Sequence, residues 1–304
     1  MVTGLFFLFG LVIGSFLNVC ITRIPEDESV VSPGSRCPRC RTPIKPYDNV
    51  PVLSWLILRG KCRKCGLPIS PLYPLVELST ALLFVACYWS FGLSLVALKW
   101  VVFTCLIIVL TVTDFRVRIL PDSVNWYGAC IGVALAVRVP PDDEFVTHFA
   151  LKYLHLAPTW TWSGPIIGVL DALCGAAFGG LLLWGSAAVY KLARNREGMG
   201  MGDMKMMVMV GTFLGVRGTF LTILIGTLMG SILGLAVVLA LYFAGWKRTV
   251  AARASRMGKG IENKLRWTIA SRYQLPLGTF LGAGALLFVH FDMWIGWQLT
   301  RILR

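Results

Sequence analysis

Charged residues are scarce in this chain, and acidic residues are scarcer than basic ones. Only 14% of the 304 residues are charged, with 15 Asp and Glu against 29 Lys and Arg. This excludes an ordinary soluble globular domain, in which about 25% of residues are charged. The sequence also lacks a nucleotide-binding P-loop, a His-Glu-x-x-His motif and a Gly-x-Ser-x-Gly motif. It therefore carries no signature of a P-loop NTPase, of that class of zinc protease or of a serine hydrolase.

Apolar residues dominate the composition instead. They make up 56% of the chain, and the mean hydropathy is +0.71. Runs of about 18 or more apolar residues are long enough to cross a hydrocarbon core roughly 30 Å thick. The sequence therefore predicts an all-α polytopic membrane protein with about eight transmembrane helices, of which the fourth and sixth are the shortest. The predicted spans cover residues 2–21, 72–91, 95–113, 123–137, 166–190, 204–216, 220–244 and 275–291.

The net charge of +14 raises the question of a nucleic-acid partner, but the placement of the charge argues for membrane topology. With the N-terminus outside, most Lys and Arg fall in the alternate loops on one side, which predicts that this side is cytosolic. We therefore expect no nucleic-acid partner, and we expect the basic stretch 246–274 to contact anionic membrane lipids. The first run lacks a basic n-region and a cleavage pattern, so it is predicted to be a retained span.

The first loop is polar and basic, and it contains two Cys-x-x-Cys pairs: Cys37, Cys40, Cys62 and Cys65. Two such pairs at this separation are typical of a tetrahedral structural zinc site. The alternative is disulfides, which a reducing cytosol disfavours. We predict three parts: the first transmembrane helix (1–21), a cytosolic zinc-binding domain that resembles a zinc ribbon (22–71), and a seven-helix transmembrane core (72–304).

Two aspartates stand at the margins of predicted spans. Asp203 lies in GMGMGDMK (198–205), between glycines and an apolar run, and Asp114 ends the run 95–113. A carboxylate at such a margin is costly, and its default interpretation is functional. The charge asymmetry places both residues at the same cytosolic edge, which predicts an aspartyl protease dyad. In such a dyad the two carboxyl groups share a proton, so that one acts as base and the other as acid.

Several polar residues have structural alternatives. Asp203 could instead be the N-cap of the sixth span, and Asp122 is interpreted as the N-cap of the fourth. Asn18 is expected to make an interhelical hydrogen bond, beside a closely packed Gly14, or else to contribute to a cytosol-facing site. Glu77 is either an ion-paired residue or part of such a site.

The segments GSFLNV (14–19), the two cysteine pairs, YPLVE (73–77), TDFRVRILPD (113–122) and GMGMGDMK (198–205) occur in this order. Together they resemble the bacterial type IV prepilin peptidases, membrane aspartyl proteases of the Gly-x-Gly-Asp class. In that resemblance Asp114 and Asp203 match the catalytic pair, and Cys37, Cys40, Cys62 and Cys65 match the zinc-type cysteines. Thr279 stands where the family often has proline, and the loops 138–163 and 246–274 are long for the family.

The resemblance implies a bifunctional enzyme of the bacterial inner membrane whose active site faces the cytosol. It implies cleavage of type IV prepilins or pseudopilins after the glycine of a basic leader. It also implies N-methylation of the new N-terminal residue, with S-adenosylmethionine as donor. The sequence contains no glycine-rich strand-to-helix turn for the donor, so its binding residues are not identified, and the first cytosolic domain and Asn18 are only candidates. The alternatives are a peptidase of this class without methylation, and a non-enzymatic membrane transporter or assembly scaffold whose aspartates line an ion pathway.

Overall fold

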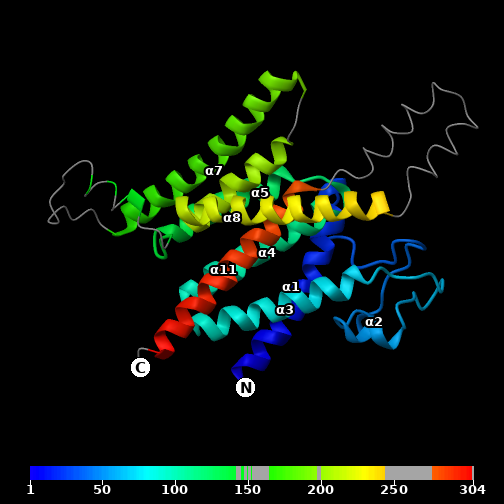
Figure 1. Ribbon diagram of the computed structural model, residues 1–304. Coiled ribbons are helices and arrows are strands. Elements are labelled where there is room, and N and C mark those ends of the chain that lie inside the picture. Colours follow the sequence, from blue (N-terminus) through cyan, green and yellow to red (C-terminus); the bar gives the residue numbers. More distant parts are fainter. Residues whose placement is uncertain are drawn as a thin grey trace, which may run out of the picture.

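The computed structural model describes residues 1–141, 164–196, 200–243 and 276–302, together with Phe145, Val146, Phe149 and Lys152. Within these residues the chain is helical and contains no β-strand (Figure 1). Five helices are long and apolar enough to cross a membrane, which confirms a helical membrane protein. The principal helices are α1 (Val2–Arg23), α3 (Leu72–Phe91), α4 (Leu95–Val117), α5 (Asp122–Ala136), α7 (Gly164–Arg194), α8 (Met201–Phe243) and α11 (Leu277–Ile302).

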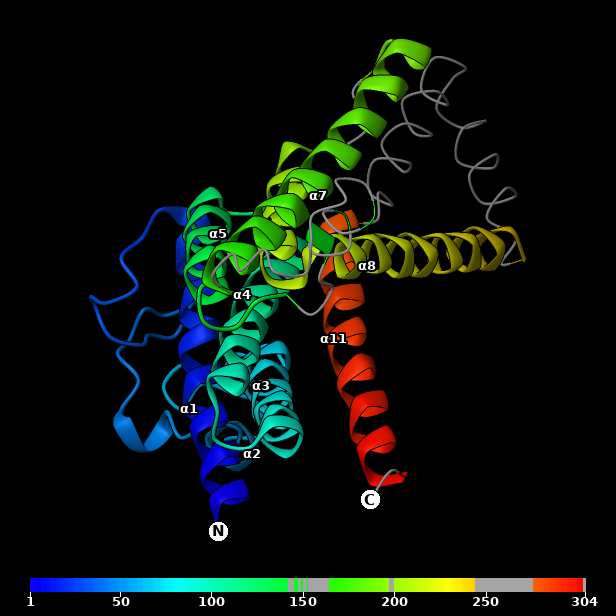
Figure 2. The same cartoon turned by 90° about the vertical axis from the view of Figure 1, so that its left-hand side faces the viewer.

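The predicted sixth and seventh spans correspond to the two helical stretches of α8, which meet at a kink at Gly215. Gly215 has φ 70° and ψ −167°, a conformation that is essentially restricted to glycine. The residues between the two predicted spans are helical. After the kink α8 first packs against α11, where a Cβ on Gly226 would lie 2.9 Å from Cα of Leu281, and only its end extends away from the other helices (Figure 2). The predicted fourth span corresponds to α5, which has only 15 residues and is not among the five membrane-capable helices.

The main core lies between α4, the first part of α8 and α11. Phe103 of α4 and Phe213 of α8 pack with ring centroids 5.1 Å apart, and Leu281 of α11 joins the same buried cluster. Inside a membrane such contacts stabilise through close packing rather than through exclusion of water. This packing brings the end of α4, the start of α8 and the start of α11 to one place.

Helices α1 and α3 form a second close contact. A Cβ at Gly14 would lie 2.7 Å from Cα of Glu77, and a Cβ at Gly10 would lie 2.5 Å from Cα of Ala81. Glycine at these positions lets the two backbones touch, as small residues do in membrane helix pairs. Asn18 is buried and donates through Nδ2 to the carbonyl of Tyr73 at 3.0 Å. The interhelical hydrogen bond expected of Asn18, and the close packing expected of Gly14, are confirmed.

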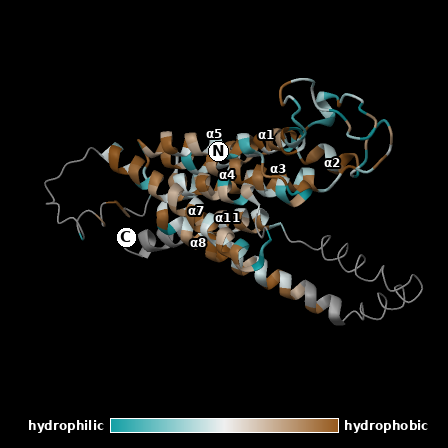
Figure 3. Ribbon diagram, turned by 90° about the horizontal axis from the view of Figure 1, so that it is seen from above, coloured by the Kyte–Doolittle hydropathy of each residue, from teal (hydrophilic) through white to brown (hydrophobic). Residues whose placement is uncertain are grey.

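A hydrophilic segment that contains the short helix α2 (Leu53–Ile57) lies beside the ends of α1 and α3 (Figure 3). The segment contains two similar turns, CPRCRTPI (37–44) and CRKCGLPI (62–69). In each turn the N–H of the first cysteine donates to a carbonyl five residues later, at 3.0 Å for Cys37 and 2.9 Å for Cys62. An isolated antiparallel bridge closes each turn. It joins Arg36 to Pro43 in the first turn and Lys61 to Pro68 in the second. The domain is thus built from two equivalent knuckles.

Two side-chain contacts hold the knuckles to the rest of this segment. Arg63 makes a bidentate ion pair with Asp48, at 2.7 and 2.8 Å, and hydrogen bonds from Arg63 hold the pKa of Asp48 below its usual value. Trp55 of α2 donates through Nε1 to the carbonyl of Ile69 at 3.2 Å. The boundaries 22–71 for a separate domain stay a prediction.

Candidate functional site

Asp114 lies in the last turn of α4, and its side chain is turned into the protein. The residue is 6% exposed. Its Oδ2 accepts a hydrogen bond from the backbone N–H of Thr279 at 2.6 Å and another from the Thr279 hydroxyl at 2.9 Å. Helix α11 begins at Leu277, so Thr279 belongs to the first turn, where backbone N–H groups have no partner inside the helix. Asp114 therefore caps α11 and is oriented by it.

Asp203 is the third residue of α8, which begins at Met201. The alternative that Asp203 is the N-cap residue is therefore wrong, because an N-cap residue precedes the first helical turn. Asp203 is 8% exposed, and its Oδ2 lies 3.5 Å from the position that a Cβ of Gly200 would occupy. The carboxylate is held near the positive end of α8, which favours a negative charge.

Gly278 shows that the two carboxylates share one small space. A Cβ on Gly278 would lie 3.0 Å from Oδ2 of Asp114 and 3.1 Å from Oδ1 of Asp203. It would also lie 2.9 Å from Leu120 Cδ1. The structure thus brings together the two aspartates that the sequence paired, from helices that are far apart in the chain. The start of α11 supplies the third side of the site.

Sequence reasoning did not identify Gly278 and Thr279 as parts of this site. The available signal was the segment PLGT (276–279). Its proline has no backbone N–H and suits the start of a helix, and two small residues follow after Leu277. The sequence marks Thr279 only as a departure from the pattern that the resemblance implies. Its contact with Asp114 explains why this position matters.

Asp122 and Lys205 connect two of the helices around the site. Asp122 is the first residue of α5, and Pro121 occupies the N-cap position. Its carboxylate pairs with Nζ of Lys205 at 2.6 Å. The prediction that Asp122 is the N-cap of the fourth span is therefore wrong, because its side chain reaches across to α8 instead. This ion pair joins the start of α5 to the start of α8, two residues from Asp203.

The four cysteines of the two knuckles converge as a metal site requires. The sulfur atoms of Cys37, Cys40, Cys62 and Cys65 all lie within 4.8 Å of one another. The Sγ atoms of Cys37 and Cys65 are 3.9 Å apart. Tetrahedral zinc with Zn–S bonds of about 2.3 Å separates its sulfur ligands by about 3.8 Å. All nine cysteines of the chain are free, so the geometry fits zinc and gives no support to disulfides.

The surroundings of two ligands favour the thiolate that zinc binds. Hydrogen bonds with the side chain and backbone of Thr42 lower the pKa of Cys40 to about 6, and backbone hydrogen bonds lower the pKa of Cys62. For Cys65 the backbone hydrogen bond with Leu67 is outweighed by burial and the neighbouring cysteines, which raise its pKa to about 11. A thiol that ionises near neutral pH releases its proton to a metal more readily than an unperturbed cysteine does.

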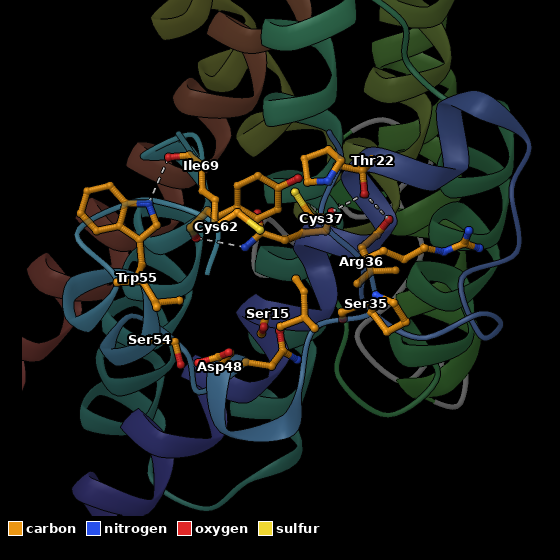
Figure 4. Close-up of a pocket in the computed structure, with 18 of the residues that line it drawn as sticks. Ser15, Thr22, Ser35, Arg36, Cys37, Asp48, Ser54, Trp55, Cys62 and Ile69 are labelled. Atoms are coloured by element: carbon orange, nitrogen blue, oxygen red, sulfur yellow. Dashed lines mark hydrogen bonds between the residues drawn. The ribbon is translucent and has the colours of Figure 1, made fainter. Parts of the chain in front are cut away.

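A cavity of about 690 Å³ lies between the knuckles and the ends of α1 and α3. Figure 4 shows Trp55, Ser54 and Asp48 along one side of it and Cys37, Arg36 and Ser35 along the other, with Ser15 of α1 at its base. Glu77 of α3 also lines it and is 8% exposed. Oε2 of Glu77 accepts a hydrogen bond from the backbone N–H of Val52 at 2.7 Å. Glu77 therefore anchors the hydrophilic segment to α3.

At the other end of the molecule, Asp171 of α7 is 1% exposed. Its Oδ1 accepts a hydrogen bond from the backbone N–H of Val146 at 2.7 Å. Asp171 thus holds the backbone at Val146, and it belongs neither to the aspartate pair nor to the cysteine cluster.

Two family models match successive parts of the chain. Residues 8–91 match the Bacterial Peptidase A24 N-terminal domain, and residues 101–235 match the Type IV leader peptidase family. No solved structure shows a significant match.

Curated relatives are similar over most of the chain. A prepilin leader peptidase/N-methyltransferase of Myxococcus xanthus is 38% identical over 79% of this chain and 64% of its own length. Proteins of the same description from Neisseria gonorrhoeae and Pseudomonas aeruginosa are 32% and 34% identical, each over 76% of this chain, and the matches cover 80% and 79% of their own lengths. The chain belongs to the type IV leader peptidase family.

Proposed function

We propose that this protein is a membrane aspartyl endopeptidase that removes the leader of type IV prepilins or pseudopilins and then N-methylates the new N-terminal residue. The observation that carries the proposal is the pair of buried carboxylates, Asp114 and Asp203, that border the single point marked by Gly278. The relatives, named as prepilin leader peptidase/N-methyltransferases, support both activities.

In the proposed reaction the two carboxyl groups have different protonation states. The ionised group takes a proton from a water molecule, which attacks the scissile carbonyl, while the protonated group donates to the carbonyl oxygen. The proton that was taken from water then passes to the leaving amine. Thr279 fixes the orientation of Asp114 through two hydrogen bonds to one oxygen. Such fixing keeps the reacting groups at a productive distance.

Two cofactors belong to the proposal. Cys37, Cys40, Cys62 and Cys65 would hold a structural zinc ion, which stabilises a segment with few buried apolar residues. S-adenosylmethionine would be the methyl donor. The location that we propose is the bacterial inner membrane, with the aspartates facing the cytosol and the basic segments against anionic lipid. The stretch 246–274 lies outside the described residues.

The test is an assay of the purified protein with a prepilin substrate, with and without S-adenosylmethionine, followed by intact-mass analysis of the product. The proposal requires loss of the leader in both reactions and the addition of one methyl group only with the donor. Cleavage without added mass would indicate the peptidase that does not methylate. Absence of cleavage by a folded protein would favour the transporter or scaffold.

A further inference from the structure

The cavity beside the knuckles is shaped like a small-molecule site. Its volume of about 690 Å³ falls within the range of roughly 300–1,000 Å³ that ligand pockets occupy. One face of α1 lines it through Ser15, Asn18, Val19 and Thr22, which recur at the spacing of a helix face. Two of the four knuckle cysteines, Cys37 and Cys62, line it as well. The metal site and the cavity therefore share a wall.

The side chains of the cavity suit a ligand that carries both signs of charge. Glu77 is buried, and no Lys or Arg side chain of the described residues pairs with it. A buried carboxylate without a cation is costly, so a positively charged group beside it is favourable. Tyr73 and Trp55 also line the cavity, and aromatic faces attract cations and stack on planar rings. Basic side chains outnumber acidic ones there, seven to four, which suits a carboxylate elsewhere on the ligand.

The cavity adjoins the same end of α4 as Asp114. Arg116 lines the cavity and follows Asp114 by two residues in the last turn of that helix. Another pocket, of about 640 Å³, is lined almost wholly by apolar residues such as Phe6, Phe9 and Leu98. It offers no charged group to a polar ligand.

We propose that the cavity binds the methyl donor, an adenosyl sulfonium compound, with the cationic sulfur near Glu77. This inference rests on the methylation proposed above. In the transfer the neutral N-terminal amine attacks the methyl carbon. The new C–N bond forms as the C–S bond breaks, the sulfur keeps the electron pair as a thioether, and the ammonium product loses a proton to solvent. The chain's part is to hold the donor's methyl group toward the amine that cleavage exposes.

The test measures binding rather than turnover, by calorimetry on the full-length protein in nanodiscs. The ligands are S-adenosylmethionine, which carries the sulfonium charge, and S-adenosylhomocysteine, which does not. Val19→Trp places a bulky ring in the cavity from α1, and Phe16→Trp is its control at a neighbouring exposed position of the same helix. Glu77→Gln removes the charge but keeps an oxygen that can accept from Val52.

We expect Val19→Trp to weaken the affinity for both ligands by about tenfold or more, and Phe16→Trp to leave both unchanged. Glu77→Gln should weaken the affinity for S-adenosylmethionine by about tenfold and the affinity for S-adenosylhomocysteine much less. Only the sulfonium compound loses an ionic partner in this variant. Melting temperatures near that of the parent establish that the variants are folded, and the cleavage rate is measured alongside as a separate activity.

Parental affinity of folded Val19→Trp for both ligands would overturn the assignment of the cavity, and the proposed function would stand if the parent still methylates. The same result, with loss of co-purified anionic phospholipid from Val19→Trp, would assign the cavity to a lipid head group instead. A parent protein that cleaves but neither methylates nor binds the donor would overturn the methyltransferase function and this inference together.

Discussion

Thr279 donates two hydrogen bonds to the same oxygen of Asp114, one from its backbone at 2.6 Å and one from its hydroxyl at 2.9 Å. Proline, which the resemblance to the family leads one to expect at this position, would supply neither donor. This chain orients Asp114 through both donors of one residue. The hydroxyl lies 3.3 Å from the carbonyl oxygen of Thr111 as well, so it bridges two successive turns of α4.

The hydroxyl of Thr279 can be tested alone. Thr279→Val keeps the shape and the backbone donor but removes the hydroxyl, whereas Thr279→Ser keeps both donors. A hydrogen bond to a charged group contributes about 1.5–3 kcal/mol, so we expect kcat/KM for leader cleavage to fall about tenfold or more in Thr279→Val. Thr279→Ser should stay within about twofold of the parent. Equal rates for the parent and Thr279→Val would show that the hydroxyl does not orient the site.

The aspartates are the central prediction. Asp114→Asn and Asp203→Asn should each reduce prepilin cleavage by about 1,000-fold or more, because an amide can neither take a proton from water nor donate one as a carboxylic acid does. Cleavage is followed by gel shift of the substrate, and folding by thermal melting. Asp171→Asn is the matched control, because it changes a buried aspartate of α7 whose oxygen accepts from Val146. Near-parental cleavage by either of the first two variants would contradict the dyad.

The same variants separate the two activities. We expect Asp203→Asn to methylate a substrate that has already been cleaved. The attack of an amine on a sulfonium methyl group does not need the carboxylate that hydrolysis requires. Labelled donor and pre-cleaved pilin provide the measurement. If a folded Asp203→Asn transfers no label, the aspartate also positions the amine, and the two reactions share one site.

Gly278 should tolerate no side chain. Gly278→Ala would place a methyl group about 3 Å from oxygen atoms of both aspartates and from Leu120, so the carboxylates must move apart. A displacement near 1 Å can reduce a rate by about 100-fold, and we expect a loss of cleavage of that order. Gly185→Ala, in α7, is the control, because nothing lies within 4 Å of its Cβ position. A fully active Gly278→Ala would show that the site has more room than the structure indicates.

Zinc is predicted to hold the knuckles together. Elemental analysis should find close to one zinc per chain, and Cys37→Ser or Cys62→Ser should lower the zinc content and destabilise the hydrophilic segment, because each removes a thiolate ligand. We expect methylation to suffer more than cleavage, since both cysteines line the proposed donor cavity. Cys130→Ser, at an exposed position of α5, is the control. Two disulfides and no metal in the purified protein would refute this prediction.

Local patterns in the sequence determined much of the architecture. Apolar runs predict membrane helices because the bilayer imposes a minimum length on any segment that crosses it. The spacing within and between the cysteine pairs predicts the cluster that the structure forms, since a metal requires its ligands to converge. The two aspartates were found because a charge at the margin of an apolar run is costly. Their proximity is confirmed, and their catalytic role stays a prediction.

Other features depended on packing between distant segments. The sequence places the junction between the sixth and seventh spans at residues 217–219, whereas the two helical stretches of α8 meet at Gly215, because glycine adopts that conformation readily. The position of Asp122 after Pro121 predicts a helix cap, but its carboxylate forms an ion pair with Lys205 of another helix. No local signal at Asp122 could have identified a partner 83 residues away.

The sequence by itself thus determined the class of protein, the metal-type cysteines and the two carboxylates, because each follows from composition or from short-range spacing. Only the tertiary structure decided that Gly278 and Thr279 complete the aspartate site and that the knuckles and α1 enclose a cavity. Asp114 and Thr279 are 165 residues apart. Their contact exists because α4 and α11 pack together, a consequence of side-chain fit across the whole bundle that no single segment encodes.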